Sequence, residues 1–214
     1  MLSIIFIILS SYLLGSIPFG IIICKLWKGI DIREHGSKNP GATNVYRVVG
    51  PIPALIVLFL DISKGLLAVI LLSQVSFDQP VLNQTSLKII AAIAVILGHI
   101  FPLFASFKGG KGVATGLGAL ISLTPLELAS ALLLFLLIVA ITRYVSLGSL
   151  SSALFILLAL SFERYYLHNP IADELLITIL VLNVFIFYTH RSNIKRLLGG
   201  SENKFGKNRL NINP

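Results

Sequence analysis

The chain has 214 residues, of which 56% are hydrophobic and only 12% are charged, and its formal net charge is +8. A soluble domain carries about twice that charged fraction, so the composition excludes a water-soluble globular protein. In a membrane protein, an excess of Lys and Arg indicates cytoplasmic loops and anionic lipid headgroups rather than a nucleic-acid partner.

Seven apolar segments predict an all-α, polytopic membrane protein. A hydrocarbon core about 30 Å thick needs about 20 apolar residues of helix, and fewer where loops enter the membrane. The first segment has no basic residue before it and has Lys25 and Lys28 after it, the reverse of the charge order in a signal peptide. We therefore expect an uncleaved first span with its N-terminus outside. The segments are 2–24, 52–75, 87–107, 112–123, 125–141, 147–162 and 175–188.

The stretch 112–141 can form one long tilted helix or two short helices hinged at Thr124 and Pro125, with Pro125 at the first position of the second helix. Charge favours two helices. All but three of the Lys and Arg residues then fall on one side of the membrane, as the positive-inside rule requires. The three exceptions are Lys64, Lys88 and Arg164.

This count predicts seven transmembrane helices, with the N-terminus outside and the C-terminus in the cytoplasm. We expect them to form one domain over 1–198. The polar stretch 199–214 is predicted to be a poorly ordered cytoplasmic tail.

The first polar segment on the predicted cytoplasmic side, 36–47, concentrates hydrogen-bond donors beside a span. Glycine lets backbone N–H groups converge, Ser and Thr donate hydrogen bonds, and an Arg guanidinium holds two phosphate oxygens at once. A solvated turn is the alternative, but acidic residues occur only upstream, at Asp31 and Glu34. We therefore predict an anion site. Its candidate residues are Ser37, Asn39, Gly41, Thr43, Asn44 and Arg47.

The second polar segment, 107–115, is glycine-rich and leads directly into a predicted helix. Free N–H groups and the positive end of the helix dipole favour phosphate binding at such a place. It is not a Walker A loop, because Ala105 stands where that motif needs glycine and a glycine stands where it needs Ser or Thr. We expect Gly116 and Gly118 to be small residues for helix packing. The candidate ligands are Lys108, Gly109, Gly110, Lys111 and Gly112.

The third polar segment, 189–198, continues from the last span. His190 and Asn193 are three residues apart and share a helix face, next to a basic stripe that begins at Arg191. A basic helix beside a membrane more often binds only lipid headgroups. The His–Asn pair, on the same predicted side as the other two segments, indicates chemistry instead.

Two charged residues lie inside the second predicted span, Asp61 and Lys64. Charges at membrane depth are costly and are usually paired, so we expect a structural ion pair. A proton relay is the alternative, and it keeps a transporter of an organic phosphate as the second functional hypothesis. We expect a positioning role for His99. Cys24 is the only cysteine, so no intrachain disulfide can form. It forms no ligand-spaced cluster with the histidines, so we predict no metal site.

Three motifs occur in order: Gly-Ser-Lys-Asn-Pro-Gly-Ala-Thr-Asn, Phe-Lys-Gly-Gly-Lys-Gly-Val-Ala-Thr and His-Arg-x-Asn-x-x-Arg-Leu-Leu. Together they resemble the signatures of the bacterial acyl-phosphate:glycerol-3-phosphate acyltransferase family. The resemblance implies catalysis by Ser37, Arg47, His190 and Asn193, and glycerol-phosphate binding by the second motif. It further implies that Arg191 and Ser146 contact substrate and that Glu202 is the structural glutamate of the third motif.

What the resemblance implies for function is an enzyme of the bacterial cytoplasmic membrane with its active site at the cytoplasmic face. It would transfer a long-chain acyl group from acyl phosphate to the 1-hydroxyl of glycerol 3-phosphate, giving lysophosphatidic acid, the first step of phospholipid synthesis. No cofactor is expected. The expected partners are these substrates, membrane lipids and a peripheral enzyme that supplies acyl phosphate.

The proton acceptor has two candidates. Acyl phosphate is a mixed anhydride with a good leaving group, so no covalent enzyme intermediate is required. Either His190 deprotonates the glycerol hydroxyl or the phosphate of the donor takes the proton. The transporter hypothesis is weaker, because transporters place their sites near the midplane and often show repeated halves, and no repeat occurs here.

Overall fold

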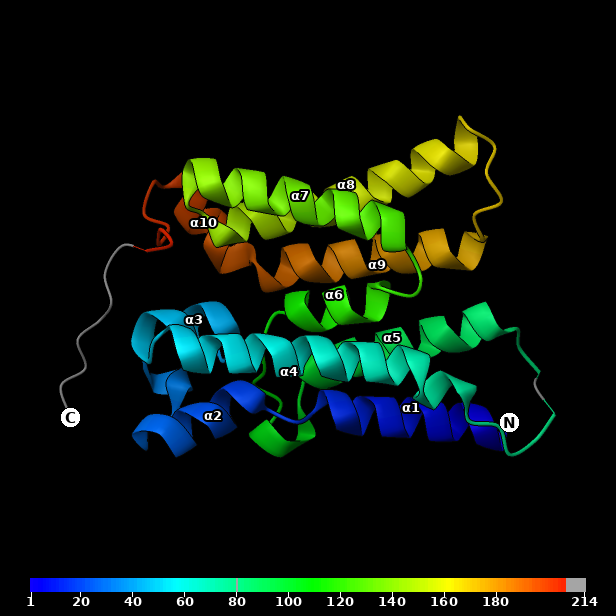
Figure 1. Ribbon diagram of the computed structural model, residues 1–214, viewed down its shortest axis with the longest axis horizontal. Helices are drawn as coiled ribbons and strands as arrows, with labels where there is room; N and C mark the ends of the chain where they lie inside the picture. The colour runs from blue at the N-terminus through cyan, green and yellow to red at the C-terminus, as the bar shows by residue number, and fades with distance from the viewer. Residues whose placement is uncertain (80, 207–214) are drawn as a thin grey trace. The chain divides into compact units, whose positions relative to one another are not determined.

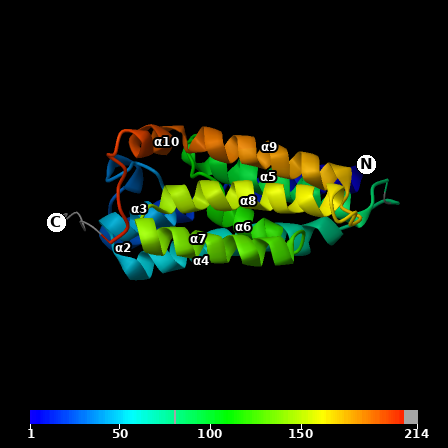
Figure 2. The same ribbon diagram turned by 90° about the horizontal axis from the view of Figure 1, so that it is seen from above.

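The computed structural model describes residues 1–79 and 81–206, shown in Figure 1 and Figure 2 as helices joined by loops. These residues contain no strand, which confirms the predicted all-α class. They divide into two compact units, one from Met1 to Leu123 and one that begins at Thr124. The single domain over 1–198 stays a prediction.

The first unit contains six α-helices and three short 3-10 helices. Its helix pairs α1 with α5 and α4 with α6 pack along their lengths (Figure 1). The α-helices are α1 (Leu2–Gly15), α2 (Phe19–Lys28), α3 (Ala42–Val48), α4 (Pro51–Ile70), α5 (Gln84–Ile100) and α6 (Val113–Leu120). The 3-10 helices are η1 (Ile32–Glu34), η2 (Leu72–Gln74) and η3 (Leu103–Ala105).

The first apolar segment folds as two helices, with a break between Gly15 and Phe19. Pro18 lies in this break and cannot donate a backbone hydrogen bond, which interrupts the helical ladder. Lys64 Nζ on α4 donates to the Ile17 carbonyl at 3.1 Å. The break therefore finds a hydrogen-bond donor inside the protein, as backbone groups at membrane depth require.

Glycines bring the helices of the first unit into backbone contact. A β-carbon at Gly15 would lie 2.2 Å from the Val95 carbonyl oxygen, and one at Gly118 would lie 1.9 Å from the Ile62 carbonyl oxygen. Without side chains at these points the backbones approach closely, as in many membrane helix pairs. The packing role predicted for Gly118 is confirmed. Gly116 differs, because a β-carbon there would make only an ordinary contact at 3.8 Å.

The second unit consists of three long helices and one short one, and the long helices lie side by side in both views (Figure 1, Figure 2). Arg143, with φ of 62°, reverses the chain between the first and second long helices. The last two helices meet at His190 with a bend of 61°. They are α7 (Pro125–Thr142), α8 (Val145–Tyr165), α9 (Asp173–Thr189) and α10 (Arg191–Leu198).

Five helical segments of the described chain are long and apolar enough to cross a membrane, or six if the bent pair α9–α10 is one span. The chain is thus a multi-pass membrane protein. The predicted division of 112–141 is confirmed, because α6 and α7 are separate helices and Pro125 begins α7. At eight residues α6 is about 12 Å long, well short of a membrane core about 30 Å thick. Seven spans and the orientation of the termini stay predictions.

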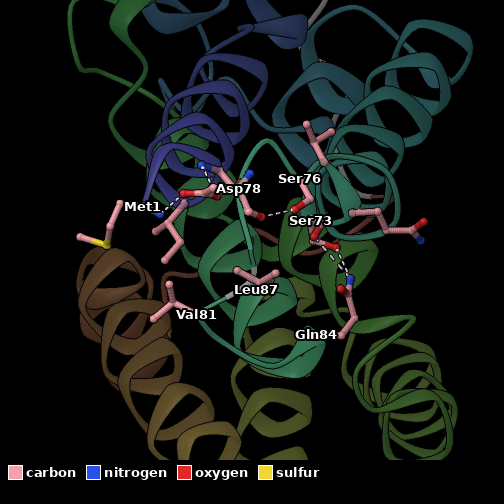
Figure 3. Close-up of a pocket in the computed structure, with 11 residues that line it drawn as sticks. Met1, Ser73, Ser76, Asp78, Val81, Gln84 and Leu87 are labelled. Atoms are coloured by element: carbon pink, nitrogen blue, oxygen red, sulfur yellow. Dashed lines mark hydrogen bonds and ion pairs between the residues drawn. The ribbon is translucent and has the colours of Figure 1, made fainter.

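A cavity of about 110 Å³ lies in the first unit beside the N-terminus (Figure 3). Asp78 makes most of the polar contacts described at this cavity. Its carboxylate pairs with the N-terminal ammonium and the Ser3 hydroxyl, and it accepts a hydrogen bond from the Leu2 N–H at 2.9 Å. Gln84 Nε2 donates to Ser73 Oγ at 3.2 Å on another wall. None of the predicted site residues lines this cavity.

The glycine contacts give a matched pair of stability predictions. Gly118→Ala would force a methyl group onto the α4 backbone, so we expect it to lower the free energy of unfolding by about 1–3 kcal/mol. Gly116→Ala, on the same helix, should have an effect near zero. Thermal unfolding of both variants in one detergent checks this, and equal melting temperatures would contradict it.

Candidate active site

Asn44 anchors the first polar segment. Its side chain is buried, with 2% of the residue exposed. The Oδ1 atom accepts a hydrogen bond from the Ser37 N–H at 2.8 Å, and Nδ2 donates to the His35 carbonyl at 3.0 Å. The turn closes so tightly on Asn44 that a β-carbon at Gly36 would lie 2.4 Å from Oδ1. The geometry therefore favours a positioning role for Asn44 over the predicted contact with substrate.

The other predicted residues of the first polar segment lie around this anchor. Asn39 Oδ1 accepts from the Gly41 N–H at 2.9 Å, a local turn typical of asparagine, and Gly41 precedes the first residue of α3. Thr43 and Arg47 are four residues apart, so they share a face of α3, and both are half-buried. Ser37 is exposed. These side chains, unlike Asn44, remain partly accessible.

An ion pair that sequence analysis missed lies just before the first polar segment, and its Arg33 bonds to the chain just before the second. Arg33 Nη2 lies 2.7 Å from Asp31 Oδ2, and Arg33 Nη1 donates to the Ala105 carbonyl at 3.1 Å. The hydrogen bonds from Arg33 lower the pKa of Asp31 to about 2. The signal in the sequence was the Asp-x-Arg spacing, because Asp31 also caps η1 by accepting from the Arg33 N–H.

The glycines of the second polar segment are packed against the end of α5. The Gly109 N–H donates to the Ile100 carbonyl at 3.2 Å, and the Gly110 N–H donates to the His99 carbonyl at 3.1 Å. The expectation that these two N–H groups are free for phosphate is therefore wrong. A β-carbon at Gly109 would lie 2.1 Å from the His99 carbonyl oxygen, so close approach explains why glycine stands there.

The two lysines of the second polar segment flank these glycines. Lys108 is exposed and Lys111 is half-buried. Ser106 and Phe107 both have positive φ, at 54° and 60°, a conformation uncommon for residues with a β-carbon. Gly112, with φ of 84°, immediately precedes α6. A sharply turned backbone thus presents two positive charges near the start of a helix.

In the second unit, Glu202 gathers three donors. It is buried, and it accepts from Asn193 Nδ2 at 2.6 Å, from Ser146 Oγ at 2.9 Å and from Arg196 Nε at 2.7 Å. Burial alone would raise the pKa of Glu202, but these hydrogen bonds outweigh it and hold the pKa below its ordinary value. The carboxylate therefore stays ionised and fixes two predicted site residues from different helices.

The segment around Glu202 is held in place by the backbone. The Ser201 N–H donates to the Arg196 carbonyl at 2.9 Å, and the Phe205 N–H donates to the Arg143 carbonyl at 2.7 Å. Residues 199–206 belong to the tail predicted to be poorly ordered, yet they make these contacts. The rest of that tail, 207–214, lies outside the described residues.

His190 sits at the bend between α9 and α10 and is 3% exposed. Its Nδ1 lies 2.8 Å from the Ile186 carbonyl oxygen, which can only accept, so Nδ1 is assigned a proton. Arg191 is exposed, donates to the Tyr188 carbonyl at 3.0 Å and stacks on the Tyr188 ring. The bend thus places a buried imidazole next to an exposed guanidinium.

Among residues 1–79 and 81–206, no three His, Cys, Asp or Glu side chains are placed to hold a metal ion. The predicted residues belong to both units. In the first unit, Arg33 bonds the stretch just before the first polar segment to the stretch just before the second. In the second, Glu202 joins Ser146 to Asn193.

The family model described as glycerol-3-phosphate acyltransferase matches residues 5–200. The chain belongs to the glycerol-3-phosphate acyltransferase family. A curated family member from Chlorobaculum tepidum is 41% identical over 99% of this chain and 100% of its own length. Another, from Desulforamulus reducens, is 44% identical over 94% of each.

Two solved structures of a glycerol-3-phosphate acyltransferase share the fold. One is PlsY, an integral membrane glycerol 3-phosphate acyltransferase, in its glycerol 3-phosphate form, with 40% identity and a TM-score of 0.82 over 95% of this chain and 96% of that one. The second is the lysophosphatidic acid form, with 39% identity and a TM-score of 0.79. The family match includes all three polar segments, whereas Glu202 lies two residues beyond it.

The depressed pKa of Glu202 predicts a pH-dependent contribution to stability. Because the folded-state pKa lies below the unfolded one, the contribution is present above the ordinary carboxylate pKa and is lost as pH falls through the folded-state value. Glu202→Gln should lower the free energy of unfolding by about 1–3 kcal/mol at neutral pH. The deficit should shrink below about pH 4.

Thermal unfolding of wild type and variant across pH measures this difference. Glu34→Gln is the control, because Glu34 is an exposed carboxylate of the first unit. A Glu202→Gln deficit that is constant from neutral to acidic pH would contradict the prediction.

Proposed function

We propose that this protein transfers a long-chain acyl group from an acyl phosphate to the 1-hydroxyl of glycerol 3-phosphate, giving lysophosphatidic acid and inorganic phosphate. The observation that carries the proposal is the likeness to PlsY across 95% of the chain, in forms named for glycerol 3-phosphate and lysophosphatidic acid. Curated relatives at 41% and 44% identity bear the same acyltransferase name. The acyl-phosphate donor rests on the three motifs of the sequence.

The chemistry needs positioning and charge more than a nucleophile on the enzyme. The glycerol oxygen attacks the acyl carbonyl, the bond from that carbon to the phosphate oxygen breaks, and the hydroxyl proton passes to a base. An acyl phosphate carries its own leaving group. The enzyme therefore has to align hydroxyl and carbonyl and to stabilise the negative charge that develops on oxygen.

In the first unit, Arg47 and Lys111 are the residues we assign to phosphate. Both are half-buried cations beside turned backbone, an environment that strengthens charge-assisted hydrogen bonds. Ser37 and Thr43 supply hydroxyl donors near Arg47. Lys108 is exposed and suits the capture of an incoming anion. Gly109 and Gly110 serve by the shape of the backbone rather than by donating N–H bonds.

In the second unit, His190, Arg191 and Asn193 are the residues we assign to the reaction, with Ser146 beside Asn193 on Glu202. The bond of His190 Nδ1 to the Ile186 carbonyl fixes the ring and supports an orienting role. We propose that His190 orients the hydroxyl and that the phosphate of the donor takes the proton.

The proposed setting is the bacterial cytoplasmic membrane, with seven spans, the N-terminus outside and the reaction at the cytoplasmic face. Support comes from the one-sided distribution of Lys and Arg. A peripheral enzyme that makes acyl phosphate is the proposed partner, because an acyl chain with a phosphate head partitions into the membrane surface. The transporter alternative gains nothing from the buried pair, since Asp61 and Lys64 make an ion pair of 2.9 Å.

Purified protein supplied with palmitoyl phosphate and glycerol 3-phosphate tests the function. We expect phosphate release and lysophosphatidic acid only when both substrates are present. Palmitoyl-CoA and palmitoyl acyl carrier protein serve as alternative donors in parallel reactions. Activity with a thioester and none with the acyl phosphate would overturn the donor assignment.

The role of His190 is tested by a pH profile. We expect His190→Ala to lower kcat while leaving the pH dependence of kcat unchanged, because the donor phosphate accepts the proton. His168→Ala, which removes an exposed histidine, is the control and should match wild type. If His190→Ala instead costs 100-fold or more and abolishes the acidic limb of the profile, His190 is the base.

A further inference from the structure

His99 is a buried group to which the proposed reaction assigns no task. It lies in the last turn of α5, with 8% of the residue exposed. Its Nδ1 is 3.5 Å from Asp61 Oδ1 on α4. The other edge of its ring covers Gly110, where a β-carbon would lie 2.1 Å from Nε2 and 2.9 Å from Cε1. One imidazole thus bridges a carboxylate on a neighbouring helix and the second polar segment.

Asp61 is itself held in place. Lys64 Nζ lies 2.9 Å from Asp61 Oδ1 and donates to the Ile17 carbonyl, and both charged side chains are almost fully buried. The chain of contacts therefore runs from the break between α1 and α2, through Lys64 and Asp61, to His99. These polar groups are buried, and electrostatic contacts between buried groups are stronger than in water.

The same chain of contacts reaches both polar segments. A cavity of about 10 Å³ is lined by Asp61, Lys64 and His99 together with Pro40 of the first polar segment and the glycines of the second. A β-carbon at Gly20 would lie 1.8 Å from the Pro40 carbonyl oxygen, so the first polar segment is pressed onto α2 at this point.

We propose that His99, held by Asp61, is a positioning residue that fixes the second polar segment, so that Lys108 and Lys111 are held in the geometry that binds the phosphate of glycerol 3-phosphate. This inference rests on the proposed function. The ring acts through the backbone, because its Nε2 edge packs against Gly110 and the Gly110 N–H donates to the His99 carbonyl. Removing the ring removes the packing contact that holds Gly110 in place.

The first test measures the affinity for glycerol 3-phosphate by calorimetry, without donor, and kinetic constants with palmitoyl phosphate. We expect His99→Ala to weaken glycerol 3-phosphate binding and raise its KM by roughly tenfold, with kcat and the KM for donor changed much less. His99→Asn keeps a donor toward Asp61 and should recover part of the loss. A fall in kcat with unchanged KM for glycerol 3-phosphate overturns the proposal.

A double-mutant cycle tests the contact itself. Gly110→Ala in the wild type drives a methyl group into the His99 ring. In His99→Ala that space is open, so Gly110→Ala should lower the affinity for glycerol 3-phosphate much less there. Gly109→Ala is the matched control. Its β-carbon would meet the His99 carbonyl oxygen, which His99→Ala retains, so its cost should be the same in both backgrounds. Equal costs for Gly110→Ala in the two backgrounds overturn the proposal.

Lys111→Ala separates failure of this inference from failure of the proposed function. If Lys111→Ala weakens glycerol 3-phosphate binding and His99→Ala does not, only the positioning role is wrong. If neither variant changes binding, the second polar segment is not the site for glycerol 3-phosphate, and both proposals are wrong. Melting temperatures identify any variant that fails to fold, and His99→Asn then decides the outcome.

Discussion

The constraint behind much of this structure is that polar backbone groups at membrane depth must find partners within the chain. The break between α1 and α2 shows it most directly, because Lys64 reaches from α4 to the Ile17 carbonyl. The glycine-rich segment also completes hydrogen bonds within the chain, because the N–H groups of Gly109 and Gly110 donate to carbonyls at the end of α5. At these two places, a side chain or a neighbouring helix end completes the hydrogen bonds of irregular backbone.

The polar residues fall into two groups: buried residues that hold the chain in place, and residues that remain accessible. Asn44 and Glu202 are buried, and the bonds described for them run to the chain itself. Ser37, Arg47 and Lys111 are partly accessible. Such an arrangement suits the proposed reaction, because buried anchors hold the backbone that carries the accessible groups.

The helical segments and the hinge at Pro125 could be predicted from the sequence. Hydropathy and charge are summed over whole segments, so they do not depend on where any single side chain points. The roles of single polar residues could not be predicted in this way. Asn39 and Asn44 are the same residue type five positions apart, and only the fold shows that one closes a local turn while the other is buried against two carbonyls. Likewise, spacing cannot show which way the N–H groups of Gly109 and Gly110 point.

The position of Glu202 has a practical side for work on the protein. This carboxylate follows the last helix by only a few residues, yet it holds side chains from α8 and α10. An affinity tag fused directly after Leu198 would replace Glu202, the acceptor for the Ser146 and Asn193 side chains. Fusion beyond Gly206 would leave the closing turn and its bond to Arg143 intact.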